Sequence, residues 1–153
     1  MRVRLRGYDV TRTFEFKQSG HLNPALSDPS TRTLSADKLI GRWVNTNRET
    51  RGIAECVVER VDETFTVSIA GVGAERPIDW PTAKARALAN LEEEAGQRTF
   101  ALAATFDFVF MKEETYIRVN KGVLVIVLFI SFRDGSKRSD YVNREFFYRK
   151  DKP

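Results

Sequence analysis

Apolar and polar residues alternate along most of the chain from residue 43 onward, with the period of two that is typical of half-buried β-strands. In residues 64–70, for example, Phe65, Val67 and Ile69 share one face. Short polar segments such as Lys112-Glu113 and Asp134-Gly135-Ser136 are interpreted as turns between strands. The pattern predicts strands over residues 43–47, 53–61, 64–70, 99–111, 114–119, 123–132 and 139–149.

These strands favour a mostly β protein whose antiparallel strands close into an up-and-down barrel, because closure removes exposed strand edges. Residues 123–132 are apolar at nearly every position, which predicts a strand buried on both faces. About eight strands are expected, the usual number for a small barrel.

One stretch departs from the β pattern. Residues 82–95 are rich in Ala, Leu, Glu, Lys and Arg, follow Pro81 and precede Gly96. Apolar residues recur there at spacings of three and four, which predicts one inserted helix. Two placements remain open for it: a lid over the barrel mouth beside Trp80, or a helix docked on the outside.

The 153 residues are the length of a single domain with one core. Residues 1–40 are expected to contribute an N-terminal strand over 2–16 and a loop over 19–33, and residues 41–150 the barrel. The loop holds His21, the one histidine of the chain.

Composition narrows the class of protein. The chain has 42% hydrophobic and 30% charged residues, an ordinary globular balance. Eleven Phe residues predict rings that line a core or an apolar cavity. The single cysteine, Cys56, excludes an internal disulfide, and the charged start 1–6 lacks the apolar run of a signal peptide, so we expect a cytoplasmic location.

Two classes of partner are not expected. The longest apolar stretch, 123–130, is far shorter than the roughly 20 residues of a membrane helix, so a membrane is not an expected partner. The net charge of +4 comes from interspersed acids and bases without a recognised motif, so nucleic acid is not expected either.

The segment Leu39-Ile40-Gly41-Arg42-Trp43 resembles the Gly-x-Trp step that opens the barrel of calycins, the superfamily of lipocalins, fatty-acid-binding proteins, avidins and nitrobindin-like proteins. The resemblance implies that Trp43 closes one end of the barrel and that an arginine of the last strand, Arg144 or Arg149, packs across it. A planar guanidinium stacked on an indole is a favourable contact. We expect Gly41, Trp43 and Arg149 to be structural residues.

The ligands of these families do not carry over with the fold. The chain lacks the helix pair of fatty-acid-binding proteins after the first strand, and the C-terminal histidine by which nitrobindin-like proteins hold haem. In avidins an Asn two residues after the Trp helps to hold the ligand, and Asn45 matches that position. No cofactor is implied.

Few residues suit other chemistry. One His and one Cys cannot supply the three or four ligands of a zinc site, so no metal is expected. Asp107 lies between Phe106 and Phe108, and it faces either outward or into the barrel. An inward carboxylate would need a partner such as Arg118, Arg144 or Arg149.

Three functions follow as hypotheses. The first is a binding protein for a small apolar or acidic molecule, with candidate ligand-binding residues Trp43, Asn45, Phe106, Phe108, Arg118 and Tyr148. The second is an isomerase, cyclase or hydratase that uses a buried carboxylate–arginine pair, Asp107 as base and Arg144 as its electrostatic partner. The third is a non-catalytic interaction domain that forms a homodimer through its Arg-rich first strand.

Overall fold

The computed structural model describes residues 30, 32–33, 36–89 and 97–150. These residues form ten strands: β1 (Arg32–Thr33), β2 (Gly41–Asn45), β3 (Ile53–Val61), β4 (Thr64–Gly71), β5 (Ile78–Asp79), β6 (Ala83–Ala89), β7 (Gln97–Asp107), β8 (Met111–Asn120), β9 (Val123–Phe132) and β10 (Tyr141–Arg149). The expected strand 2–16 and His21 lie outside the described residues.

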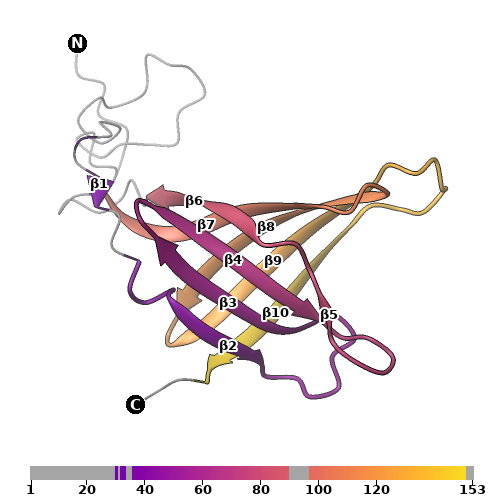
Figure 1. The fold of residues 1–153 in the computed structure, drawn as a ribbon, viewed down its shortest axis with the longest axis horizontal. Helices are drawn as coiled ribbons and strands as arrows, with labels where there is room; N and C mark the ends of the chain where they lie inside the picture. Colours follow the sequence, from indigo (N-terminus) through magenta and orange to yellow (C-terminus); the bar gives the residue numbers. More distant parts are fainter. Residues whose placement is uncertain (1–29, 31, 34–35, 90–96, 151–153) are drawn as a thin grey trace, which may run out of the picture.

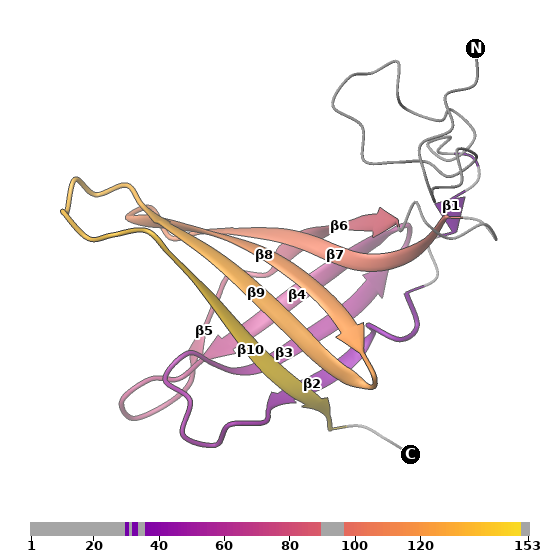
Figure 2. The same cartoon turned by 180° about the vertical axis from the view of Figure 1, so that it is seen from behind.

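Eight of these strands close into an antiparallel barrel (Figure 1). Each of β2, β3, β4, β6, β7, β8, β9 and β10 pairs with the next, and β10 pairs with β2 to complete the ring. The short strand β5 adds to β4, and β1 pairs in parallel with the start of β7. The view from behind shows the same ring and the long β9–β10 hairpin, which projects beyond it (Figure 2). The expected mostly β antiparallel barrel is therefore confirmed.

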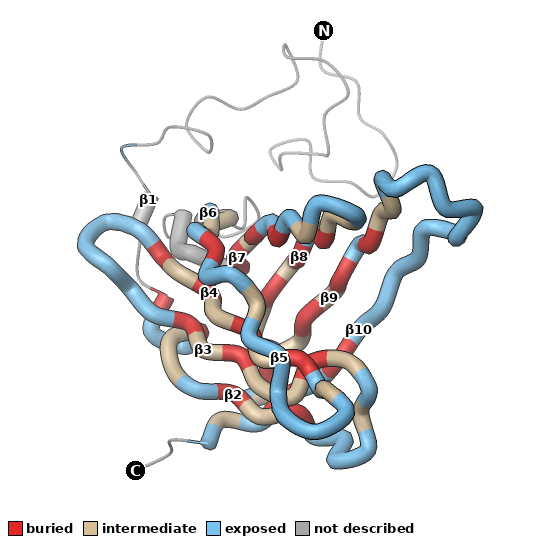
Figure 3. The backbone as a smooth tube through the Cα atoms, turned by 45° about the vertical axis from the view of Figure 1, so that its right-hand side comes forward, coloured by how far each residue is buried: buried red, intermediate tan, exposed pale blue. Residues whose placement is uncertain are grey.

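The buried residues of the core lie on strands all around this ring (Figure 3). Along the barrel strands, buried residues mostly alternate with more exposed ones, because successive side chains point to opposite faces. On β4, Phe65, Val67 and Ile69 are buried, as the sequence pattern predicts. The largest fully buried side chains are Trp43, Phe65, Phe106 and Phe147.

The prediction that residues 123–132 are buried on both faces is wrong. On the inner face of β9, Leu124, Ile126 and Leu128 are buried. On the outer face Val127 is half-buried and Phe129 is 52% exposed. Within the described residues, no second layer covers the outside of the barrel, so the apolar outer face of β9 is in contact with solvent.

The helix predicted over 82–95 is also not formed in its described part, because residues 83–89 form β6. This strand pairs with β4 on one side and β7 on the other, which bonds its backbone on both sides. Helix propensities differ by less than about 1 kcal/mol per residue, and such pairing overrides them. Ala83 and Ala85 pack toward the core, while Arg86 is exposed. Residues 90–95 of the expected helix lie outside the described residues.

The turn expected at Lys112-Glu113 lies earlier in the chain. Strand β7 ends at Asp107 and β8 begins at Met111, so both residues of the expected turn belong to β8. Residues 108–110 make the turn, with the Phe108 N–H donating to the Met111 carbonyl at 2.9 Å. No helix among the described residues is long and apolar enough to cross a membrane.

Candidate functional site

One end of the barrel is sealed by Trp43 and Arg149. The guanidinium carbon of Arg149 lies 4.6 Å from the centre of the Trp43 ring. Its nitrogens donate to the carbonyls of Ile40 at 2.6 Å and Lys38 at 2.7 Å, and the Trp43 indole donates to Leu39 O at 2.9 Å. The turn that leads into β2 is thereby fixed to the last strand.

The register of the strands explains this contact. Arg149 is the direct partner of Trp43 across the β10–β2 pair, and Arg144 instead lies over Phe146, 5.2 Å from its ring. Gly41 has a φ of +136°, which side chains rarely adopt. A Cβ there would lie 3.0 Å from Arg149 Nη1, so the glycine also gives the guanidinium room.

A second group of polar residues lies at the opposite end of β2, around Glu145. This residue is 9% exposed, and its two oxygens accept four hydrogen bonds. Oε2 accepts from the Asn45 amide and from Thr50 Oγ1 at 2.9 Å, and Oε1 from Ile53 N at 3.2 Å and Asn143 Nδ2 at 3.3 Å. Glu145 therefore ties β10 to β2, to the β2–β3 turn and to the start of β3.

Gly52 makes this network sterically possible. A Cβ on Gly52 would lie 2.1 Å from Glu145 Oε1, closer than any real contact. The carboxylate thus packs against bare backbone. Because all four donors reach it, Glu145 is a satisfied structural group and not an open binding group.

Glu113 presents the opposite situation. It lies on β8 between Phe106 of β7 and Ile130 of β9, which pair with it on either side. Glu113 is 6% exposed, on the same face of β8 as buried Thr115 and Ile117, so it points into the barrel. Its Oε2 is fully buried and has no hydrogen-bond partner among the described residues.

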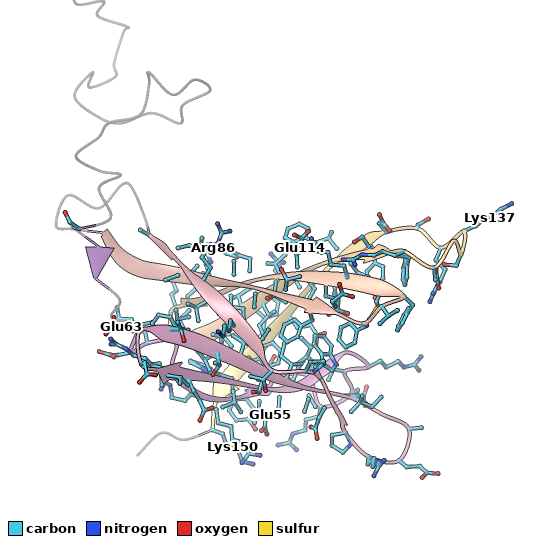
Figure 4. The ribbon with its side chains drawn as sticks, turned by 45° about the horizontal axis from the view of Figure 1, so that its top comes forward. Glu55, Glu63, Arg86, Glu114, Lys137 and Lys150 are labelled. Carbon is cyan, nitrogen blue, oxygen red and sulfur yellow. The ribbon has the colours of Figure 1, made fainter. Side chains whose placement is uncertain are left out.

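The surroundings of Glu113 disfavour its ionised form. Burial, together with the negative charge of Glu145, raises the pKa of the Glu113 carboxyl from 4.5 to about 7. Its neighbour Glu114 is exposed and pairs with Lys112 at 2.8 Å. Figure 4 shows Glu114 and Arg86 pointing away from the barrel. Adjacent glutamates on one strand thus have opposite environments.

Aromatic side chains gather around Phe106, the strand partner of Glu113 on β7. The Trp80 ring meets Phe106 and Phe108 edge to face, each at 5.2 Å between ring centres. Trp80 is held by the backbone, since its N–H donates to Ile69 O at 2.9 Å, and its indole nitrogen would lie 3.0 Å from a Cβ on Gly71. Trp80 therefore joins the end of β4 to the end of β7. It does so from the segment between β5 and β6 and not from a helical lid.

The proposed pair of Asp107 and Arg144 is not formed. Asp107 has 56% of its side chain exposed, pairs with Arg133 at 2.9 Å and accepts a hydrogen bond from Val109 N at 2.9 Å. These two contacts lower the pKa of the Asp107 carboxyl. The buried base that the enzyme hypothesis needs is therefore not Asp107.

The six candidate ligand-binding residues divide between the two sides of the barrel wall. Trp43, Asn45 and Phe106 are buried inside, and Phe108 is half-buried against Trp80. Tyr148 is 49% exposed, and Arg118 alternates with buried Ile117 and so belongs to the outer face. Arg118 and Tyr148 thus do not line the interior.

The sequence analysis singled out neither Glu113 nor Glu145. The signal for Glu145 was present, because it lies four residues from Arg149 and therefore on the same face of β10. Once Arg149 is placed over the interior Trp43, Glu145 must also point inward. Glu113 was assigned to a turn, so its face was not considered.

Other chemistry is not supported by the described residues. Burial raises the pKa of the Cys56 thiol to about 12, so it is an unreactive core residue. Within the described part of the chain, no three His, Cys, Asp or Glu side chains gather in a way that would hold a metal ion. Comparisons with protein-family models, curated proteins and solved structures found no match.

Proposed function

We propose that this protein binds a small, largely apolar molecule inside a calycin-like barrel. The observation that carries the proposal is the buried, unpartnered Oε2 of Glu113. A buried polar atom without a partner costs stability, and such groups in native proteins call for an explanation. A ligand that donates a hydrogen bond to Oε2 supplies that explanation.

The surroundings of Glu113 support this proposal. Small-molecule sites are mostly apolar, with a few polar groups that orient the ligand. Phe106 and Ile130 are the strand partners of Glu113, and Trp80 packs on Phe106, so the carboxyl lies on an apolar stretch of the wall. A barrel of about eight strands is just wide enough to be filled by its own side chains or to hold one small ligand, and the proposal takes the second case. The Trp43–Arg149 closure supports the calycin-like assignment, and the single free cysteine supports the cytoplasmic location.

Native mass spectrometry of the protein purified from its own host tests the proposal. We expect the wild type to carry an added mass that is lost on denaturation. Glu113→Gln should carry less of it. Glu114→Gln, a matched change on the outer face of the same strand, should carry as much as the wild type. An unliganded wild type that also fails to take up the neutral apolar dye Nile red would contradict the proposal.

Acid–base catalysis on the bound molecule is the second candidate function. It is favoured by the near-neutral pKa of Glu113, since a general acid or base works best near the ambient pH. Glu113 would take the role first assigned to Asp107. The test is to incubate the extracted molecule with protein and to analyse it for chemical change. Conversion by the wild type and not by Glu113→Gln supports catalysis, and an unchanged molecule supports binding alone.

A further inference from the structure

We propose that the ligand carries a protonated amine, and that its ammonium group binds the free Oε2 of Glu113. This inference rests on the proposed function and adds the chemistry of the ligand's polar end. It also replaces the expectation of an acidic ligand, which assumed an inward-facing arginine.

The first argument concerns hydrogen-bond donors. An ionised carboxylate only accepts hydrogen bonds, so Oε2 of Glu113 needs a donor from the ligand. The two neutral buried polar side chains already use their donors: Thr115 Oγ1 donates to Ala104 O at 2.9 Å, and the Asn45 amide donates to Ile53 O at 2.7 Å and to Glu145. Neither of these side chains satisfies Oε2 of Glu113, so a ligand can supply its donor.

The second argument concerns charge. Among the described residues, the buried polar side chains are two carboxylates, Glu113 and Glu145, and two neutral groups, Asn45 and Thr115. No Lys or Arg is buried with them in that part of the chain. Arg149 lies at the sealed end and is occupied by Trp43 and the entry turn. Above the raised pKa of Glu113, about 7, the interior near this residue is thus negative, which attracts a cation and repels a carboxylate.

The third argument excludes a metal ion as the cation. Hard divalent cations take six to eight oxygen ligands, several of them usually carboxylates. Both oxygens of Glu145 already accept hydrogen bonds, which leaves Glu113 alone. One carboxylate suffices for an ammonium, which forms a strong charge-assisted hydrogen bond. The rings of Trp80 and Phe106 nearby also favour an organic cation with an apolar body.

The experiment compares three headgroups on the same apolar chain. Straight-chain 1-aminoalkanes, 1-alkanols and alkanoates, from butyl to decyl, are titrated into the full chain at about pH 8, with binding measured by displacement of Nile red and by calorimetry. At this pH both the amine and the Glu113 carboxyl are ionised. We expect the best amine to bind about tenfold more tightly than the alcohol of equal length, and the carboxylate to bind most weakly.

Variants assign this preference to one residue. Glu113→Gln keeps the shape and removes the charge, so the amine should lose its advantage while the alcohol keeps its affinity. Glu114→Gln should behave as the wild type. The three headgroups are compared on the wild type itself, so the test does not depend on how any variant folds.

The outcomes separate the two proposals. If alcohols or carboxylates bind as tightly as amines, or if the amine preference survives in Glu113→Gln, the amine inference is wrong while ligand binding stands. If no headgroup binds at any chain length, the proposed function itself is wrong, and the inference fails with it.

Discussion

Replacing Glu113 by glutamine should stabilise the folded protein, and the gain should grow as pH rises. Glutamine has nearly the same shape as glutamate but no charge to bury. Most substitutions in a core destabilise, so a gain here is an unusual expectation. It follows from a buried carboxylate oxygen that nothing in the described structure satisfies.

The sign and size of this stability change follow from the pKa of the Glu113 carboxyl. Folding raises the pKa of the Glu113 carboxyl from 4.5 to about 7, so between these values the folded state binds more protons than the unfolded state. The contribution of Glu113 to the free energy of unfolding is therefore fully present below about pH 4.5 and is lost as the pH rises through 7. Each change of one in pKa corresponds to about 1.4 kcal/mol, so the loss above pH 7 is about 3 kcal/mol. Glu145 is the charged residue that contributes to this rise.

Urea unfolding of the wild type and of Glu113→Gln at about pH 5 and pH 8 measures this difference. We expect similar free energies of unfolding near pH 5, and near pH 8 a variant more stable than the wild type by about 2 to 3 kcal/mol. Glu114→Gln, which changes an exposed carboxylate on the same strand, should follow the wild type at both pH values. A variant that is less stable than the wild type at pH 8, or a difference independent of pH, would refute the reasoning.

Three further predictions concern the residues around the site. Glu145→Gln should lower the free energy of unfolding by about 2 kcal/mol in urea unfolding at pH 7, because it replaces one acceptor of a four-bond network by a donor; an unchanged value would mean that the network contributes nothing. Arg149→Met should cost about 2 kcal/mol in the same assay, since it keeps the stem but loses the indole contact and the bonds to the entry turn, whereas a neutral effect would remove the sealing role. Val109→Gly should stabilise the protein by about 1 kcal/mol and so raise its thermal midpoint, because Val109 is exposed and its φ of +70° is strained for a β-branched residue but not for glycine. A lower midpoint would argue against backbone strain at Val109.

The barrel itself could be predicted from the sequence because its strands obey a simple rule. Residues 53–61 and 123–132 form strands with the predicted bounds, and the observed strand β4 extends one residue beyond the predicted 64–70. Period-two alternation and short turns are local properties, and they survive without knowledge of the partner strands. Closure was inferred from the need to remove edges, which is also a general rule.

The helix expectation failed because the sequence of residues 82–89 satisfies two periodicities. Ala83, Ala85 and Ala87 alternate with Lys84 and Arg86, which suits a strand, yet all of these residues favour helices. The strand forms because residues 83–89 pair with β4 and β7, which lie outside this segment. Local propensity carries no information about such partners.

The site was harder to predict than the barrel, since it depends on which face of each strand points inward. The turn was expected at residues 112–113, three to four residues later than its actual place at 108–110, so Glu113 was expected in a turn and not on a strand face. Asp107 attracted attention because Phe106 and Phe108 flank it, but neighbours in a strand point to the opposite face. The flanking rings therefore said nothing about the side on which Asp107 lies.

The most direct test of the central claim is a crystal structure of the protein grown with hexylamine at about pH 8. The account predicts the amine inside the barrel, with its nitrogen about 2.7 to 3.1 Å from Glu113 Oε2 and its chain against Phe106 and Ile130. A barrel interior filled by its own side chains, with the amine bound outside or absent, would contradict it.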